Sequence, residues 1–120
     1  MSNKFTDAAI NDFLAQYPTL WVSLHYDDPG LGAYNNYEVA GGSYTRKAGT
    51  FTAPTSRTIW LDNPVLFNGL PATTLTHVGF WDDQYAGNLI AVATVPNAPV
   101  SIAATGSYSI AQNAVSLSID

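Results

Sequence analysis

Apolar side chains near the N-terminus follow a helical period. Within residues 5–17 they fall on one stripe, which is made of Ile10, Phe13, Leu14 and Tyr17. Thr6 is a good N-cap residue, Asp7 places a negative charge in the first turn, and Pro18 stops the helix. The pattern therefore predicts one short amphipathic helix over about residues 5–17, with its apolar stripe packed on the rest of the protein.

From residue 19 onward, apolar and polar residues alternate in short segments, which is the period of β-strands. These segments are 19–26, 43–52, 57–61, 75–82, 87–95, 99–103, 106–111 and 114–119. In the first segment the inward positions are Leu20, Val22, Leu24 and Tyr26. In the last segment they are Val115, Leu117 and Ile119, with Ser116, Ser118 and Asp120 facing outward. The sequence predicts a mainly β protein with many short strands.

Turn-forming residues separate the strand segments at regular intervals. Asp28-Pro29-Gly30 follows the first segment, and Gly69-Leu70-Pro71 is a further predicted turn. Short strands in this rhythm are typical of an antiparallel β-sandwich, here jelly-roll-like with one covering helix. No linker, repeat or low-complexity segment interrupts the chain. We therefore expect residues 1–120 to form one β-sandwich domain.

The chain carries unusually little charge. Charged residues make up 11% of its 120 residues, against about 25% in an ordinary soluble domain, while 47% are hydrophobic. The net charge is −5, and the four basic residues are too few to follow a phosphate backbone. The composition argues against nucleic-acid binding and favours apolar contacts with other subunits over a solitary monomer.

The sequence gives no sign of a membrane segment or a secretion signal. The longest apolar run, residues 89–95, has the length of a strand, and Asp7 and Asn11 interrupt the N-terminal region. The chain has no cysteine, which rules out a disulfide framework and thiolate chemistry. We expect a protein that is made in the cytoplasm and is used there or released in a particle.

No set of residues predicts catalysis or a cofactor. Ser23 and His25 lie two apart on one strand face, but side chains at this spacing stand about 7 Å apart, beyond hydrogen-bond reach. No nucleophile elbow or orienting acid accompanies them. The acidic residues Asp27-Asp28, Asp62 and Asp82-Asp83 lack the spacing of a calcium loop and are more typical of turns. We expect no catalytic residue, no cofactor and no metal site, with calcium as the weaker alternative.

Two tryptophan–histidine pairs form the one candidate surface. Trp21 and His25 lie four residues apart in the first β segment, and His77 and Trp81 lie four apart in a later one. On a strand this spacing places both members of a pair on one face, opposite the apolar positions. If the strands are neighbours, the four side chains form an aromatic–imidazole patch. Packing or partner contact is favoured there over a sugar-binding platform.

Three segments together resemble a family of small bacteriophage virion proteins, known as head fibre, capsid decoration, minor tail or tail fibre proteins. The segments are LWVSLHYDDPG at residues 20–30, EVAGGSYTRK at 38–47 and THVGFWDDQYAGNL at 76–89. Their order and spacing carry the resemblance, which extends from about Phe5 to Asp120. It implies a compact β-sandwich that assembles as a homotrimer on a virion.

The resemblance and the composition together favour one function. We expect a non-enzymatic virion structural protein, trimeric, mounted on the outside of the capsid as a decoration or head-fibre subunit. Its expected partners are copies of itself and capsid or tail proteins. A tail-mounted short fibre or tail-tip component is the first alternative, and a host-glycan-binding module of the same fold is the second.

Overall fold

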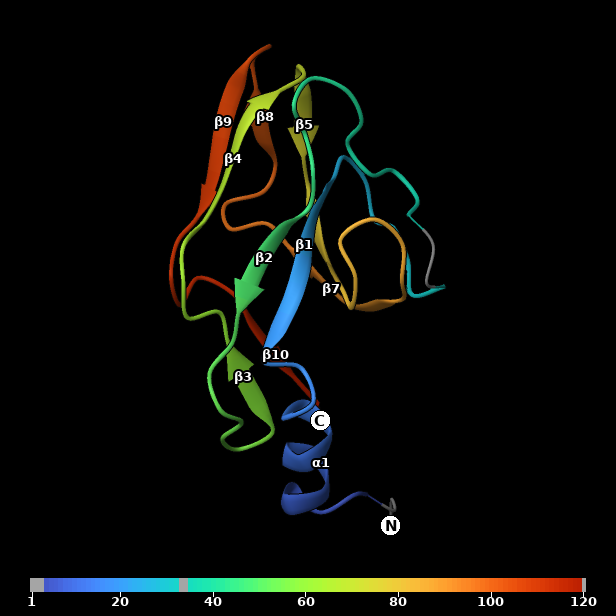
Figure 1. Cartoon of the computed structure of the whole chain (residues 1–120), viewed down its shortest axis with the longest axis vertical. Helices are drawn as coiled ribbons and strands as arrows, with labels where there is room; N and C mark the ends of the chain where they lie inside the picture. Colours follow the sequence, from blue (N-terminus) through green and yellow to red (C-terminus); the bar gives the residue numbers. More distant parts are fainter. Residues whose placement is uncertain (1–3, 33–34, 120) are drawn as a thin grey trace.

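A four-stranded antiparallel sheet forms the centre of the molecule in a computed structural model, which describes residues 4–32 and 35–119 (Figure 1). Its strands, in spatial order, are β2 (Lys47–Thr50), β1 (Thr19–His25), β6 (His77–Trp81) and β7 (Leu89–Thr94). The two central strands, β1 and β6, come from two of the segments that carry the family resemblance. The sheet therefore brings those segments into direct contact.

Three two-stranded antiparallel ribbons pack with this sheet. They pair β3 (Thr58–Trp60) with β10 (Ser116–Ser118), β4 (Val65–Leu70) with β9 (Gly106–Ile110), and β5 (Thr73–Leu75) with β8 (Val100–Ile102). The predicted class, a mainly β antiparallel sandwich with one short helix, is confirmed. The strands outside the central sheet form separate ribbons, not a second continuous sheet.

One apolar core joins the sheet, the ribbons and the helix. The inward positions predicted for the first strand, Leu20, Val22 and Leu24, are fully buried. Phe80 from β6 meets Phe51 edge-on, with ring centroids 5.7 Å apart, so aromatic packing links the sheet to the segment after β2. Tyr26 was also predicted to face inward, but it is 50% exposed because β1 already ends at His25.

The helix α1 (Asp7–Leu14) begins where the sequence predicts, although it is shorter than the predicted span. The Thr6 hydroxyl accepts a hydrogen bond from the Ala9 amide at 3.2 Å, which caps the first turn. Ile10 and Leu14 are buried as expected. The inward prediction for Phe13 is wrong: its side chain is 44% exposed, because the short helix contacts the core through the narrow Ile10–Leu14 line.

The strand β4 was not predicted. Gly69-Leu70-Pro71 was predicted to be a turn, yet residues 65–70 pair with β9. Gly69 adopts a positive φ of 63° and lies where the register of this pairing shifts, so the glycine marks an irregularity inside a strand and not its end. The last strand follows the prediction: Val115 is buried, Leu117 is half-buried and Ser116 is exposed, while Asp120 lies outside the described residues.

The molecule is elongated, with principal extents of 49 × 26 × 26 Å. The helix α1 and the β3–β10 ribbon form its lower end in Figure 1, where Phe5 and Ile119 line a common hollow. Both described ends of the chain therefore lie at this end. No helix among the described residues is long and apolar enough to cross a bilayer.

Candidate functional site

The structure brings the four predicted surface residues together. Strands β1 and β6 are antiparallel neighbours, and their register places Trp21 opposite Trp81 and His25 opposite His77. All four side chains share one face of the sheet, as the spacing predicts. The opposite face carries Val22 and the other core residues.

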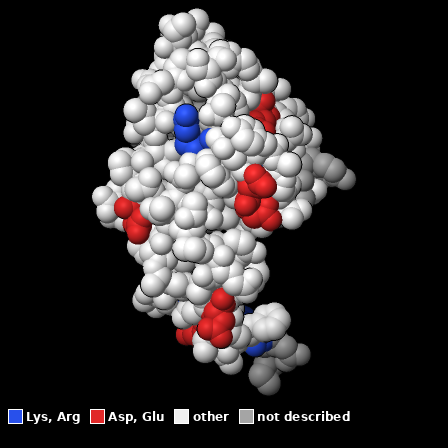
Figure 2. All heavy atoms as spheres, viewed as in Figure 1, with Lys and Arg blue, Asp and Glu red and all other residues white. Residues whose placement is uncertain are grey.

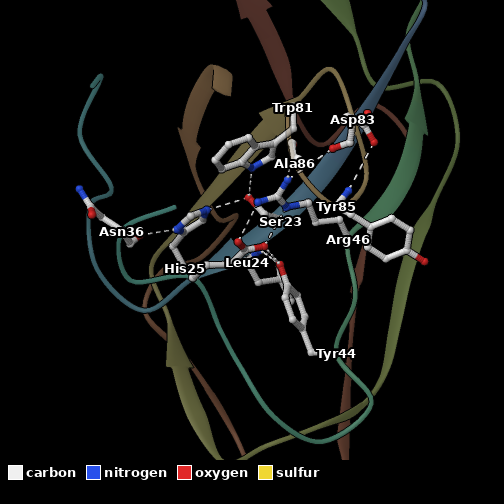
Figure 3. A network of polar contacts seen from close by, with 11 residues as sticks. Ser23, Leu24, His25, Asn36, Tyr44, Arg46, Trp81, Asp83, Tyr85 and Ala86 are labelled. Carbon is white, nitrogen blue, oxygen red and sulfur yellow. Dashed lines mark hydrogen bonds and ion pairs between the residues drawn. The ribbon is translucent and has the colours of Figure 1, made fainter. Parts of the chain in front are cut away.

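This face is largely covered by the chain itself. His25 is completely buried and Trp81 is only 3% exposed, while Trp21 and His77 are half-buried. The covering groups come from the segment between β1 and β2, because the Asn36 carbonyl contacts His25 and the Arg46 guanidinium lies over the Trp81 ring (Figure 3). Contact of Trp21 or His77 with a partner stays a prediction.

Ser23 and His25 are hydrogen-bonded, contrary to the sequence prediction. Ser23 Oγ lies 2.7 Å from His25 Nε2. The spacing of about 7 Å separates backbone positions, but side chains lean along the strand and the imidazole ring reaches its neighbour. Gly79 of β6 leaves the space for this contact, since a Cβ there would come within 2.5 Å of Ser23 Oγ and 2.9 Å of His25 Nε2.

The partners of His25 determine its tautomer. Its Nδ1 lies 2.8 Å from the Asn36 carbonyl oxygen, which can only accept, so Nδ1 carries the proton. The bare Nε2 then accepts from the Ser23 hydroxyl, whose oxygen accepts from the Trp81 indole N–H at 2.8 Å. The result is a one-way chain of hydrogen bonds in which each buried polar atom has a partner.

A second group of polar side chains surrounds Glu38. Arg46 donates to both carboxylate oxygens, with Nε–Oε2 and Nη2–Oε1 distances of 3.0 Å each. The Tyr44 hydroxyl donates to Oε2 at 2.6 Å and accepts from the Leu24 amide at 3.1 Å. Burial, followed by the charge of Glu38, raises the pKa of Tyr44 above its usual value, so the phenol stays protonated.

Arg46 also fixes the loop between β6 and β7. Its Nη1 donates to the Ala86 carbonyl at 3.0 Å, and its guanidinium carbon lies 3.7 Å from the centroid of the Trp81 ring. The Gln84 amide donates back to the Arg46 carbonyl at 3.3 Å. One arginine therefore joins the half-buried Glu38, the buried β6 tryptophan and the backbone of an exposed loop into a single unit, which Figure 3 shows from close by.

Sequence reasoning gave no role to Glu38, Tyr44 or Arg46, although all three lie in the EVAGGSYTRK segment. Glu38 is the only glutamate of the chain, and Arg46 is one of four basic residues. Because the protein carries so few charges, the presence of Glu38 and Arg46 in one short segment could have suggested that they pair. Charged residues inside a small core are seldom retained without a partner, so such a pair is expected where the segment is buried.

The acidic turns act as turns in this structure. The Asp28 carboxylate accepts from the Gly30 amide at 2.9 Å, and the Asp82 carboxylate accepts from the Asn88 amide at 2.7 Å. Asp62 accepts from the Thr50 hydroxyl. Among residues 4–32 and 35–119, no group of three or more aspartate, glutamate, histidine or cysteine side chains is placed to hold a metal ion. These contacts fit the turn-forming role that the sequence favoured.

The buried network is suited to holding two segments on the sheet. Ser23 and His25 have the atoms of a nucleophile–base pair, but both are 0% exposed and Ser23 Oγ is also occupied by the Trp81 N–H. A substrate would have to displace the packed loop to reach them. The arrangement fixes the covering segments against β1 and β6 and presents their outer surface to solvent.

We predict that acid weakens this network through His25. Burial lowers the pKa of His25 below its ordinary value of 6.5, although the Asn36 hydrogen bond and the charge of Glu38 act in the opposite direction. Below pH 6.5 the unfolded chain therefore binds a proton that the folded chain does not. The stability contributed by neutral His25 is complete above pH 6.5 and is lost as the pH falls toward the folded pKa.

An NMR titration of the His25 imidazole ring tests this prediction. The His25 ring is expected to titrate below 6.5. A folded-state midpoint for His25 at or above 6.5 would contradict the neutral, buried assignment.

The chain is a small β protein in which the segment between β1 and β2 and the loop between β6 and β7 are fixed to the central sheet by buried or partly buried polar contacts. A sequence model of the family described as Podophage GP4 fiber I protein gp80 matches residues 1–118, and the chain belongs to this family. It is therefore a bacteriophage virion structural protein. No protein in a search of curated sequences matches the chain.

Proposed function

We propose that this protein is a non-enzymatic subunit mounted on the outside of the phage capsid, as a decoration or head-fibre subunit, and that it functions as a homotrimer. The membership in a fibre protein family supports a role in the particle. The number three comes from the resemblance of the sequence segments to trimeric virion proteins. The sealed Ser23–His25 pair supports a role without catalysis.

The observation that carries the assembly proposal is a weakly charged surface with exposed apolar side chains. Phe5 is 78% exposed and Phe13 is 44% exposed, and together with Ile119 they line a hollow of about 330 Å³ at the end that holds both described termini. Figure 2 shows charged side chains only in small, separate places on the viewed face. Such a surface favours contacts made by apolar burial.

Assembly is expected to persist in high salt. Two of the four basic residues, Arg46 and Arg57, already form ion pairs within the chain, so few remain for contacts between subunits. Molar salt reduces the screening length to about 3 Å, which weakens exposed ion pairs but not apolar contacts. Sedimentation velocity at micromolar protein should give the same oligomer in about 0.1 M and about 1 M salt. A monomer in either buffer would contradict the assembly proposal.

Imaging of the intact particle by cryo-electron microscopy tests location and symmetry together. The proposal expects threefold copies on the capsid exterior. Density for the protein on the tail alone would replace it with the tail-mounted alternative, and a copy arrangement without threefold symmetry would correct the stoichiometry.

A further inference from the structure

The two edges of the central sheet differ in the hydrogen bonds that their backbones make. At the β2 edge, the Thr50 amide donates to Asn63 Oδ1 at 2.7 Å, and the Thr50 carbonyl accepts from the Asp62 amide at 2.9 Å. At the other edge, β7 pairs with β6 alone, and within residues 4–32 and 35–119 no segment is hydrogen-bonded to its outer side. The chain caps the Thr50 end of the β2 edge, whereas the β7 edge has no such cap among the described residues.

The ladder between β6 and β7 shows which backbone groups are available. The Val95 amide donates to the Thr76 carbonyl at 3.0 Å, so Val95 faces β6. Residues along an antiparallel strand face the two neighbouring positions alternately. Ala93 therefore also faces β6, while the N–H and C=O groups of Val92 and Thr94 point away from the sheet.

The sequence of β7 lacks the usual protection of an exposed edge. Residues 89–94 read LIAVAT, without a charged residue or a proline. Exposed edges are commonly protected by lysine, proline or a bulge, because an unpaired edge can add a further strand. The register shift in this ladder lies at the Trp81–Leu89 end, so the part around Val92 and Thr94 is regular.

Two uncharged hollows lie on either side of this edge. One, of about 160 Å³, is on the core side of the sheet and includes Leu20, Ile90 and Leu117 in its lining. The other, of about 250 Å³, is lined by Leu31 and residues 89–92. Side chains of a strand point alternately to its two faces, so a strand added along β7 would direct side chains into both hollows.

We propose that the free edge of β7 pairs with a strand edge of a second copy of this chain, so that the central sheet continues from one subunit into the next. This inference rests on the proposed self-assembly and names the surface that performs it. Two arguments, one from charge and one from the form of a strand edge, favour a second copy of the chain as the partner. Copies with a net charge of −5 repel one another least where they meet through uncharged surface, and neither β7 nor the two hollows contains a charged residue.

A strand edge is also complemented by another strand edge, and every copy of the chain carries one. Pairing between copies gives the free N–H and C=O groups of Val92 and Thr94 the backbone partners that they lack. Because pairing of β7 with β7 would be two-fold, in the proposed homotrimer β7 of each copy pairs with a different strand edge of the next copy, and the ring closes.

Substitutions at the two outward positions test the proposal. Thr94→Pro removes an outward N–H from an exposed residue without breaking a hydrogen bond to β6, and Val92→Lys places a charge at the same edge. The matched control is Ala48→Lys, because Ala48 is an exposed residue of the opposite edge strand, β2. Circular dichroism and thermal melting show whether each variant is folded.

The readout is the oligomer dissociation constant from sedimentation. Thr94→Pro and Val92→Lys are each expected to raise it by about tenfold or more, which corresponds to a loss of 1.4 kcal/mol, while Ala48→Lys leaves it unchanged. A folded Thr94→Pro protein that assembles like the wild type overturns the inference. If assembly instead fails in Phe5→Ser while Thr94→Pro assembles like the wild type, the proposed oligomer stands and its interface lies at the helix end, because Phe5 lines the hollow there and neither hollow beside β7. A monomeric wild type overturns both proposals.

Discussion

Replacing Trp81 with alanine is expected to lower the free energy of unfolding by about 3–5 kcal/mol, the range for removing a buried aromatic ring. Trp81 is 3% exposed, its indole N–H donates to Ser23 at 2.8 Å, and the Arg46 guanidinium lies on its ring. The substitution therefore opens a cavity and removes a donor from a buried network. Urea unfolding followed by circular dichroism at neutral pH measures the change.

Two further variants separate the contributions. Trp60→Ala is the control, because Trp60 is 45% exposed, and surface changes of this kind usually cost about 0.5 kcal/mol or less. Trp81→Phe keeps most of the ring and removes the donor, so it should cost about 1–3 kcal/mol. A Trp81→Ala protein as stable as the wild type would show that the ring is not a packing residue, and would revive the sugar-platform alternative.

The periodicity of the sequence predicted most of the fold because strand and helix patterns are local. The apolar alternation in the first β segment places Leu20, Val22 and Leu24 in the core, and the Thr6 cap begins the helix where expected. The strand β4 was missed for a local reason as well. Gly69 inside it adopts a backbone conformation that is more common in turns, and only pairing with β9 reveals it as part of a strand.

The sequence predicted which strand positions of the candidate site share a face, but not the contacts that their side chains make. Four-residue spacing correctly placed Trp21 and His25 on one face, but it could not show which loops cover that face. The Ser23–His25 contact depends on the direction in which the imidazole ring leans and on the absence of a side chain at Gly79. Neither follows from the periodicity of apolar and polar residues.

The contacts of Arg46 were hidden for a different reason. They reach Glu38 8 positions away and Ala86 40 positions away along the chain. Only the tertiary arrangement brings such groups together, so no local pattern predicts them. Residue type was the remaining signal, since a lone glutamate and a rare arginine occur in one motif.

Arg46→Ala is expected to destabilise the protein by about 3–5 kcal/mol, because it leaves a buried carboxylate without its partner. The side chains of Arg46 and Glu38 are only 7% and 12% exposed, and both carboxylate oxygens accept from Arg46. The same change frees the loop between β6 and β7, which loses its hydrogen bond from Arg46 to Ala86. Chemical unfolding gives the stability, and hydrogen exchange should show faster exchange in residues 82–88.

A second ion pair among the described residues provides the matched control. Arg57 pairs with Asp7, whose side chain is 70% exposed, so Arg57→Ala should cost about 1 kcal/mol or less from the ion pair. If the large loss in Arg46→Ala comes from an unpaired buried charge, adding Glu38→Gln should restore part of the stability, since no charge then remains without a partner. Equal losses in Arg46→Ala and Arg57→Ala, with no recovery in the double variant, would show that the Glu38–Arg46 pair does not hold the loop on the sheet.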